Sequence, residues 1–388
     1  MMTIAETAHR GLVKLAEGVL GGLSRYNTLN DFARADGAEV VALQQQRLTE
    51  LLRHAGTRVP YYREVLRNAD VITATGEIRL ANFAKIPLLD KDGLRKHYES
   101  LKSDDLGGRE WFVNTSGGST GEPTRFIQDR ECKHWIRAIR MLFDEWSGRP
   151  IGSRQTFLWG SERDLFVGDE TWKVRLKRWL KNEQWLNAFR MRADNMRDYV
   201  ERINEFRPVQ IQAYATSIYE FARFVEEHGI EVHSPRSVLT SAGTLHPHMR
   251  ETIERVFRAP VFNRYGTREV GDIASQFSPG GGLCVVDFTH YVEILRPDGT
   301  PSPPGEPGEV VVTYLVNKAM PLIRYRIGDM AVRAAALAGS GPQWTTLERV
   351  VGRPLDIRVV EYPDSYPADE PQRRCPDISK AARQLDFR

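Results

Sequence analysis

The chain has 388 residues, of which 41% are hydrophobic and 27% charged, with a net charge of +3 at pH 7. This composition is typical of a globular protein, and the small, mixed charge argues against nucleic-acid binding. Cys132, Cys284 and Cys375 form no CxxC pair, which excludes a cysteine-rich zinc site and predicts a reducing, cytoplasmic environment.

The first 37 residues predict a helical segment. An apolar stripe at helical spacing runs through it, and we expect the stripe to pack on the rest of the protein; contact with a membrane surface is the alternative. No run of 18 apolar residues occurs, so we expect no signal peptide and no transmembrane segment. The stripe consists of Leu12, Leu15, Val19, Leu20 and Leu23.

Between residues 38 and 264, helices are predicted to alternate with short apolar strands. This alternation is typical of an α/β fold with a largely parallel sheet. The expected helices cover residues 38–57, 130–147, 192–206, 217–228 and 247–258. The expected strands cover residues 156–159, 209–213, 238–241 and 261–264.

The pattern changes in the last third of the chain. Residues 291–295 and 309–315 read as antiparallel strands on either side of a Pro/Gly-rich loop. The last 28 residues, 361–388, contain four prolines and little apolar periodicity before a short helix expected at 378–386. We interpret them as an extended tail.

The stretch NTSGGSTGEP, residues 114–123, is rich in glycine and hydroxyl side chains. Such loops wrap phosphate, because glycine lets backbone N–H groups converge and hydroxyls add donors. A polar surface turn is the alternative. Glu122 occupies a position where a phosphate loop often carries lysine.

Three later segments appear in order with this loop: TSAGTLHPHMRETIERVFRAPVFNRYGTREVG (240–271), GEVVVTYLVNKAMPLIRYRIGD (308–329) and VVGRPLDIRV (350–359). With LLRHAGTRVPYYREVL (51–66) and IPLLDKDGLRKHY (86–98), they resemble the adenylate-forming (acyl-adenylate) superfamily, and most closely its phenylacetate–CoA ligase and CapK-like branch. The resemblance covers about residues 40–360.

The resemblance implies an adenylation core over residues 1–360. We expect two sheet-and-helix subdomains, a small β-rich subdomain near 285–355, and no C-terminal lid domain after the core. Enzymes of this kind join a carboxylic acid to ATP as an acyl-AMP, with Mg²⁺. They then pass the acyl group to a thiol, such as CoA or a carrier protein, or to an amine.

The resemblance also implies site residues. The predicted phosphate loop consists of Ser116, Gly117, Gly118, Ser119, Thr120 and Gly121. The predicted adenine site consists of Ala242, Gly243, Tyr265 and Gly266, with Glu269 as the Mg²⁺ ligand, Asp329 as the ribose-binding acid and Arg353 as the basic hinge residue. The predicted carboxylate pocket consists of Trp159, Gly160, Ser161, Ala213 and Tyr214. Taken singly, Tyr265 could be a core aromatic, Glu269 half of a surface ion pair and Asp329 a turn residue. The pocket aromatics indicate an apolar or ring-bearing acid.

The chain departs from the family at four places. Glu122 replaces the loop lysine. Gly243 replaces an acidic residue, and Arg268 precedes Glu269 where a hydroxyl residue is usual, so Arg268 is a candidate substitute cation. The family's lid carries a lysine that contacts the reacting groups, and residues 361–388 do not resemble that lid. We therefore expect impaired acyl transfer.

The tail resembles the C-terminal end of extended short-chain dehydrogenase/reductases that act on nucleotide sugars, where basic residues matching Arg373 and Arg374 lie near the diphosphate. No GxGxxG fingerprint occurs in the chain. Three functions follow: activation of a carboxylic acid, with a role in polysaccharide or natural-product assembly; a non-catalytic nucleotide-binding or scaffolding relic; or a nucleotide-sugar epimerase/dehydratase fragment. A homodimer is compatible with each.

Overall fold

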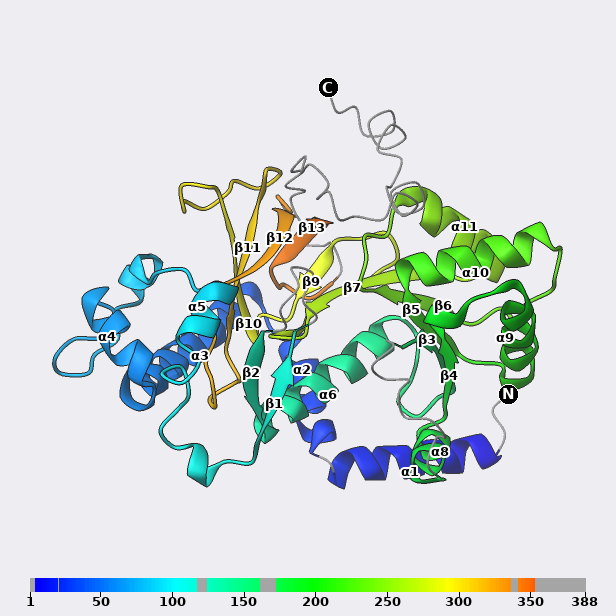
Figure 1. Cartoon of the computed structure of the whole chain (residues 1–388), viewed down its shortest axis with the longest axis horizontal. Coiled ribbons are helices and arrows are strands. Elements are labelled where there is room, and N and C mark those ends of the chain that lie inside the picture. Colours follow the sequence, from blue (N-terminus) through cyan, green and yellow to red (C-terminus); the bar gives the residue numbers. More distant parts are fainter. Residues whose placement is uncertain (1–3, 20, 117–123, 161–171, 336–340, 353–388) are drawn as a thin grey trace, which may run out of the picture. The chain divides into compact units, whose positions relative to one another are not determined.

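The structure is a computed structural model that describes residues 4–19, 21–116, 124–160, 172–335 and 341–352 (Figure 1). The chain divides into two units, Met1–Arg353 and Pro354–Arg388, and the second lies wholly outside the described residues. The tail, its expected helix and Arg353 therefore remain predictions, as does the boundary at residue 360.

The helices begin at residues whose side chains or rings suit a helix start. The carboxylate of Asp36 accepts from the backbone N–H of Glu39, and Asp129 accepts in the same way from Cys132. Pro60 and Pro247 occupy first-turn positions. The α-helices are α1 (Ile4–Val19), α2 (Gly22–Phe32), α3 (Gly37–Arg58), α4 (Pro60–Asn68), α5 (Lys91–Lys96), α6 (Arg130–Trp146), α8 (Trp172–Leu180), α9 (Ala193–Phe206), α10 (Ala215–Glu227) and α11 (Pro247–Phe257).

Most strands join one mixed sheet. Among the described residues it has eleven strands in the order β10-β11-β12-β13-β9-β8-β7-β6-β5-β3-β4, and β1 and β2 form a separate hairpin. The strands are β1 (Trp111–Thr115), β2 (Arg125–Asp129), β3 (Gln155–Trp159), β4 (Glu183–Asn187), β5 (Gln210–Tyr214), β6 (Ser237–Ser241), β7 (Val261–Thr267), β8 (Gly271–Gln276), β9 (Leu283–Val285), β10 (His290–Leu295), β11 (Pro307–Tyr314), β12 (Tyr325–Arg333) and β13 (Thr346–Gly352).

The sheet changes character at β7. From β4 to β7 neighbouring strands are parallel, and from β7 to β10 they are antiparallel. The α/β prediction is confirmed. The expected hairpin of residues 291–295 and 309–315 is β10 paired with β11, in a register that places Leu295 opposite Glu309.

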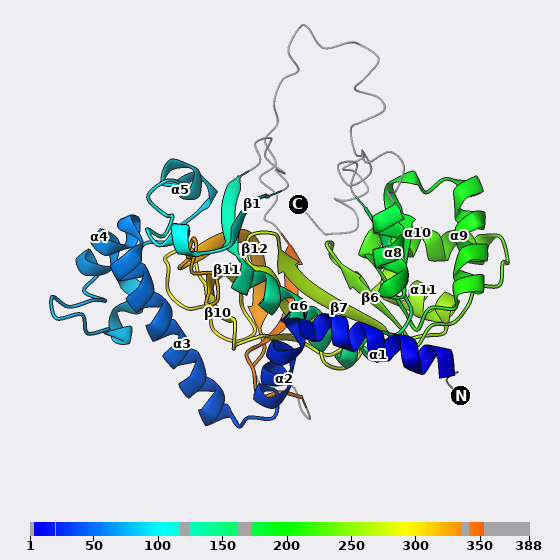
Figure 2. The ribbon, with the colours of Figure 1, turned by 90° about the horizontal axis from the view of Figure 1, so that it is seen from below.

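Helices α9, α10 and α11 cover one face of the parallel strands (Figures 1 and 2). Their apolar side chains form a core with alternate strand residues such as Leu158, Ile211 and Val238, all of which are buried. The opposite face carries Gln155, Gln210 and Gln212, so it is much more polar. Because side chains alternate along a strand, the apolar residues face the helices and the glutamines face the opposite side of the sheet. A polar face of this kind can line a ligand pocket.

The N-terminal stripe packs only in part. Leu12, Leu15 and Val19 are exposed on α1, at 56%, 68% and 79%, whereas Val13 is buried. The packing prediction is therefore wrong for these three residues, but Leu23 packs against the core as expected, and Leu20 lies outside the described residues. Within the described residues, no helix has both the length and the apolar character needed to cross a membrane. Cys132 and Cys284 are buried free thiols, and Cys375 lies outside the described residues.

Candidate functional site

The predicted phosphate loop is the tip of the β1–β2 hairpin. Thr115 pairs with Arg125 at the end of the hairpin. Just beyond this pair, the Ser116 N–H donates to the Thr124 carbonyl at 2.9 Å, and the Ser116 hydroxyl accepts from the Thr124 N–H at 3.2 Å. Ser116 is thus a buried residue that closes the neck of the loop. Gly117, Gly118, Ser119, Thr120, Gly121 and Glu122 lie outside the described residues.

The hairpin also contacts the segment that carries the predicted metal ligand. The buried side-chain amide of Gln128, on β2, donates to the carbonyls of Arg268 and Glu269, each at 3.4 Å. The Glu269 side chain is only 7% exposed, and its Oε1 lies 3.7 Å from Nζ of Lys91. Arg268 is exposed. Strand β2 therefore connects the described end of the loop, at Thr124, to the backbone of residues 268 and 269.

A single buried carboxylate suits one particular kind of metal site. No group of three or more His, Cys, Asp or Glu side chains in the described part of the chain could hold a metal ion. Mg²⁺, however, is commonly bound by one or two carboxylates together with substrate phosphates. Glu269 fits that role, because it is buried and its ion-pair partner Lys91 suits a phosphate as well.

The two predicted nucleoside contacts touch each other. The hydroxyl of Tyr265, on β7, donates to Oδ2 of Asp329, on β12, at 2.9 Å. Both side chains are half-buried. Asp329 lies inside β12, near a register shift against β13, and not at a turn that ends a strand. An aromatic plate and a carboxylate acceptor thus face the same space, as an adenosine site would require.

The backbone around these residues is unusual in two places. Ala242, directly after β6, has φ 53°, a left-handed conformation that costs a residue with a Cβ about 1–2 kcal/mol. At Gly266 a Cβ would lie 2.5 Å from the carbonyl oxygen of Gly271, so only glycine fits at this irregular pairing of β7 with β8. Ala242 and Gly243 are exposed at the carboxyl end of the parallel strands, the edge at which open α/β sheets bind ligands.

The predicted carboxylate pocket is a pair of stacked aromatics. Trp159, at the end of β3, stacks on Tyr214, at the end of β5, with ring centroids 4.1 Å apart. Ala213 is buried and contributes to the core beneath. Gly160 has φ 135°, which favours glycine, and Ser161 lies outside the described residues.

Arg324 and Arg353 are two further cations in the last third of the chain. Arg324 is buried and ion-paired with Glu293 at 3.0 Å, so its charge is committed to the fold. Arg353 lies outside the described residues, but a Cβ on its neighbour Gly352 would lie 3.5 Å from Oγ1 of Thr244. The end of β13 therefore lies beside the 242–244 turn, where the family resemblance places the adenine.

Sequence reasoning missed Lys91, Arg95 and Gln128. Lys91 and Arg95 lie on α5, which Asp90 caps by accepting from the Gly93 N–H at 2.7 Å. The Arg95 guanidinium donates to Oγ1 of Thr124 at 3.1 Å, at the neck of the loop. The available signal was the segment IPLLDKDGLRKHY, which resembles the family but lies about 30 residues before the loop. Only tertiary contacts bring it there.

Comparison with known proteins finds relatives both in sequence and in fold. CapK of Staphylococcus aureus is 25% identical over 323 residues, which are 82% of this chain and 69% of CapK. The phenylacetate-coenzyme A ligase of Escherichia coli (strain K12) is 25% identical over 350 residues, 88% of this chain and 77% of that ligase. The solved structure of 2-hydroxyisobutyryl-CoA ligase in its postadenylation state matches with a TM-score of 0.65 at 17% identity, covering 83% of this chain and 69% of that one. No family model matches the chain.

The described core has the fold of adenylate-forming enzymes. In sequence, the chain is similar to CapK and to phenylacetate-coenzyme A ligases, at 24–25% identity. The resemblance inferred from the sequence motifs is confirmed.

Proposed function

We propose that this chain activates a carboxylic acid with ATP, forming an acyl-AMP and releasing pyrophosphate. The observation that carries the proposal is the hydrogen bond between Tyr265 and Asp329, at 2.9 Å. It joins two side chains that lie 64 residues apart and that the family resemblance assigns to one nucleoside. Glu269 follows β7, and Lys91 of α5 lies beside its carboxylate. Gln128, on the strand that follows the loop neck at Ser116, donates to the Glu269 carbonyl.

Each residue has a role with a physical reason. Tyr265 offers a ring face to adenine, and Asp329 accepts hydrogen bonds from the ribose hydroxyls. Mg²⁺ on Glu269 would neutralise phosphate charge. Lys91 and Arg268 offer positive charge where the carboxylate approaches the α-phosphate, and such preorganised charge typically changes a rate by about 10²–10³.

The acceptor is a thiol or an amine, and CoA is the thiol that the relatives' names indicate. We propose that a protein of these 388 residues forms the adenylate faster than it transfers the acyl group, because residues 361–388 do not resemble the family's lid, which carries the lysine that contacts the reacting groups. We further propose a cytoplasmic enzyme that works in polysaccharide or natural-product assembly, with CapK as the supporting relative. A carrier protein and a homodimer are compatible with this proposal.

The test is exchange of labelled pyrophosphate into ATP over a panel of carboxylic acids, with acyl-AMP and acyl-CoA measured separately. Asp329→Ala should weaken AMP binding by about 100-fold, the value of two charge-assisted hydrogen bonds. Asp31→Ala, which removes an exposed carboxylate on α2, is the matched control. Lys91→Gln and Arg268→Gln should lower the exchange rate more than they weaken AMP binding.

Three results would contradict parts of the proposal. Binding of AMP without exchange for any acid would favour a nucleotide-binding scaffold. Equal binding of UDP-glucose and ATP would favour the nucleotide-sugar alternative. Efficient acyl-CoA synthesis would confirm activation but refute the expectation of impaired transfer.

A further inference from the structure

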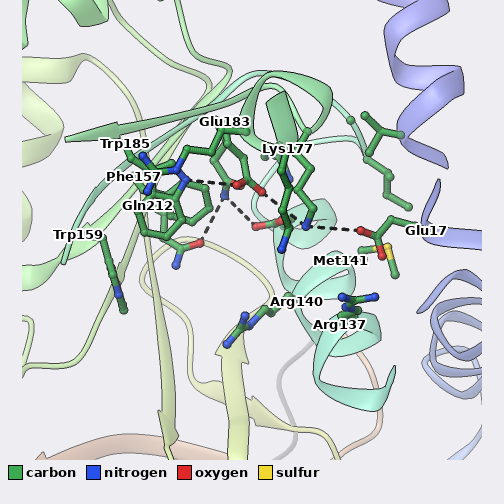
Figure 3. Close-up of a pocket in the computed structure, with 18 of the residues that line it drawn as sticks. Glu17, Arg137, Arg140, Met141, Phe157, Trp159, Lys177, Glu183, Trp185 and Gln212 are labelled. Carbon is green, nitrogen blue, oxygen red and sulfur yellow. Dashed lines mark hydrogen bonds and ion pairs between the residues drawn. The ribbon is translucent and has the colours of Figure 1, made fainter. Parts of the chain in front are cut away.

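A cavity of about 500 Å³ lies against the polar face of the parallel strands (Figure 3). Its walls come from β3, β4 and β5 on one side and from α6, α8 and α1 on the other. Trp159 lines this cavity and also belongs to the predicted carboxylate pocket. The volume is in the range of about 300–1,000 Å³ that holds small organic ligands. The cavity thus lies where the distal end of an acid bound at Trp159 would extend.

Aromatic rings form the strand side of the cavity. Phe157 stacks on Trp185 with centroids 4.5 Å apart and an interplanar angle of 17°. Trp159 is the next residue on the same face of β3. In Figure 3 these rings lie across the cavity from Arg137 and Arg140 of α6. A planar group could stack on such a wall at little entropic cost.

The described lining is strongly cationic. Seven lysine and arginine side chains line the cavity, but only three carboxylates do. Those carboxylates are already paired: Asp144 with Arg149 at 2.8 Å, and both Glu17 and Glu183 with Lys181, at 3.7 and 3.9 Å. Within the described part of the chain, Arg137 and Lys177 have no carboxylate partner. Unpaired positive charge around an enclosed space attracts anions.

Arg264 is a buried cation of this lining with one unpartnered donor. The residue is 7% exposed, and its Nε has no hydrogen-bond partner among the described residues. Nη1 lies 3.5 Å from Oδ1 of Asp272, an acid that it shares with Arg140. The guanidinium lies 5.8 Å from the ring centroid of Trp159. Burial lowers the pKa of Arg264. A buried N–H donor without a hydrogen bond destabilises the protein, so an anionic group that accepts from Nε would bind favourably here.

We propose that this cavity is the distal subsite for the acid and that it binds a second anionic group, a carboxylate, sulfonate or phosphate, on a ring-bearing substrate. The inference rests on the proposed function for the reacting end of the acid. Arg264, Arg137 and Lys177 contact the distal anion, and Phe157 and Trp159 contact the ring. The preferred substrate is therefore an aromatic or cyclic acid with two negative charges.

The probes are para-sulfophenylacetate and its neutral isostere para-sulfamoylphenylacetate, which differ in distal charge and hardly in shape. Pyrophosphate exchange gives kcat/KM for each, and calorimetry without nucleotide gives each Kd. We expect the sulfonate to be preferred by at least about tenfold in both measurements, the value of one charge-assisted hydrogen bond. Lys177→Gln and Arg137→Gln should each reduce that ratio, whereas Arg34→Gln, at an exposed arginine in the turn after α2, should not.

Arg264→Lys keeps the charge but removes the unpartnered Nε, and should also reduce the ratio; its fold is checked by circular dichroism. Tighter binding of the sulfonate without exchange for either acid would support the anionic subsite and refute the proposed reaction. Exchange with equal kcat/KM for both acids would support the reaction and overturn the anionic subsite. A charge preference that survives both glutamine variants would also overturn this assignment.

Discussion

Arg324 should stabilise the fold without acting on the reaction. Its side chain is 4% exposed, and Nε and Nη2 donate to the carboxylate of Glu293 at 3.1 and 3.0 Å. Nη1 donates to the carbonyl of Ile86 at 2.7 Å and to that of Ala84. Arg324→Met would leave the Glu293 carboxylate, itself 13% exposed, without its partner. Breaking a buried pair in this way costs about 3–5 kcal/mol.

Thermal unfolding gives the measurement. The first unit spans 353 residues, and unfolding entropy is about 2.1 cal/mol/K per residue, which gives about 0.7 kcal/mol per degree. Arg324→Met should therefore lower Tm by about 4–7 °C. Burial raises the pKa of Glu293, so the deficit should be smaller at pH 5 than at pH 8, because a protonated Glu293 tolerates burial better.

Two variants make this result decisive. Arg324→Met with Glu293→Leu should recover most of the lost stability, since no buried charge is then left unpaired. Arg326→Met removes an arginine of the same strand whose partner Glu309 is 22% exposed, and should cost about 1 kcal/mol or less. If Arg324→Met behaves like Arg326→Met, the buried-pair argument is wrong and Arg324 becomes a candidate cation for the reaction.

Three further predictions concern the binding site and the core. Tyr265→Phe removes the hydrogen bond to Asp329 but keeps the ring, so AMP binding measured by calorimetry should change by less than about threefold, whereas Tyr265→Ala should weaken it by tenfold or more; equal losses would exclude stacking. Gly266→Ala brings a Cβ within 2.5 Å of the Gly271 carbonyl and should cost about 1–3 kcal/mol in urea unfolding, whereas Gly107→Ala, with no atom within 4 Å, should be neutral. Burial raises the pKa of Asp287 to about 7 and lowers that of His290 to about 4. The Asp287 contribution to stability is complete below pH 4 and is lost as pH rises through 7, whereas the His290 contribution is present above its ordinary pKa of 6.5 and is lost as pH falls through 4. The two contributions change with pH in opposite directions, so Asp287→Asn should make the free energy of unfolding rise between pH 4 and 6.5. An unchanged pH profile would refute the opposing titrations.

Much of the fold could be predicted from local sequence signals. The helix predicted over residues 247–258 is α11, Pro247–Phe257, and the strand predicted over 238–241 is β6, Ser237–Ser241. Both have clear apolar periodicity and a defined start. Strand β4, Glu183–Asn187, was not predicted, because an edge strand that borders a polar cavity carries few apolar residues.

The site was predictable only through motifs that resemble a family. The hydrogen bond between Tyr265 and Asp329 joins two strands that are not neighbours in the sheet order, so no local pattern indicates it. Lys91 reaches Glu269 across 178 residues of sequence, because Leu89 bridges to Tyr325 of β12 and places α5 there. The cationic lining around Arg264 comes from several separate elements, so the sequence indicated a ring-bearing acid but no second charge.

The reacting and distal ends of the acid would meet the same electrostatic problem. At the reacting end a carboxylate must approach the phosphates of ATP, and two unit charges 4 Å apart repel by about 4 kcal/mol at an effective dielectric of 20. In the proposed reaction, Lys91, 3.7 Å from Glu269, and the exposed Arg268 would counter that repulsion locally. A second anionic group on the acid adds to the repulsion unless it is held apart from the phosphates and neutralised. Arg264, on the strand that also carries Tyr265, would do both, because successive side chains of β7 point to opposite faces. One strand would then separate the nucleotide from the distal anion and select an acid that few neutral pockets could bind.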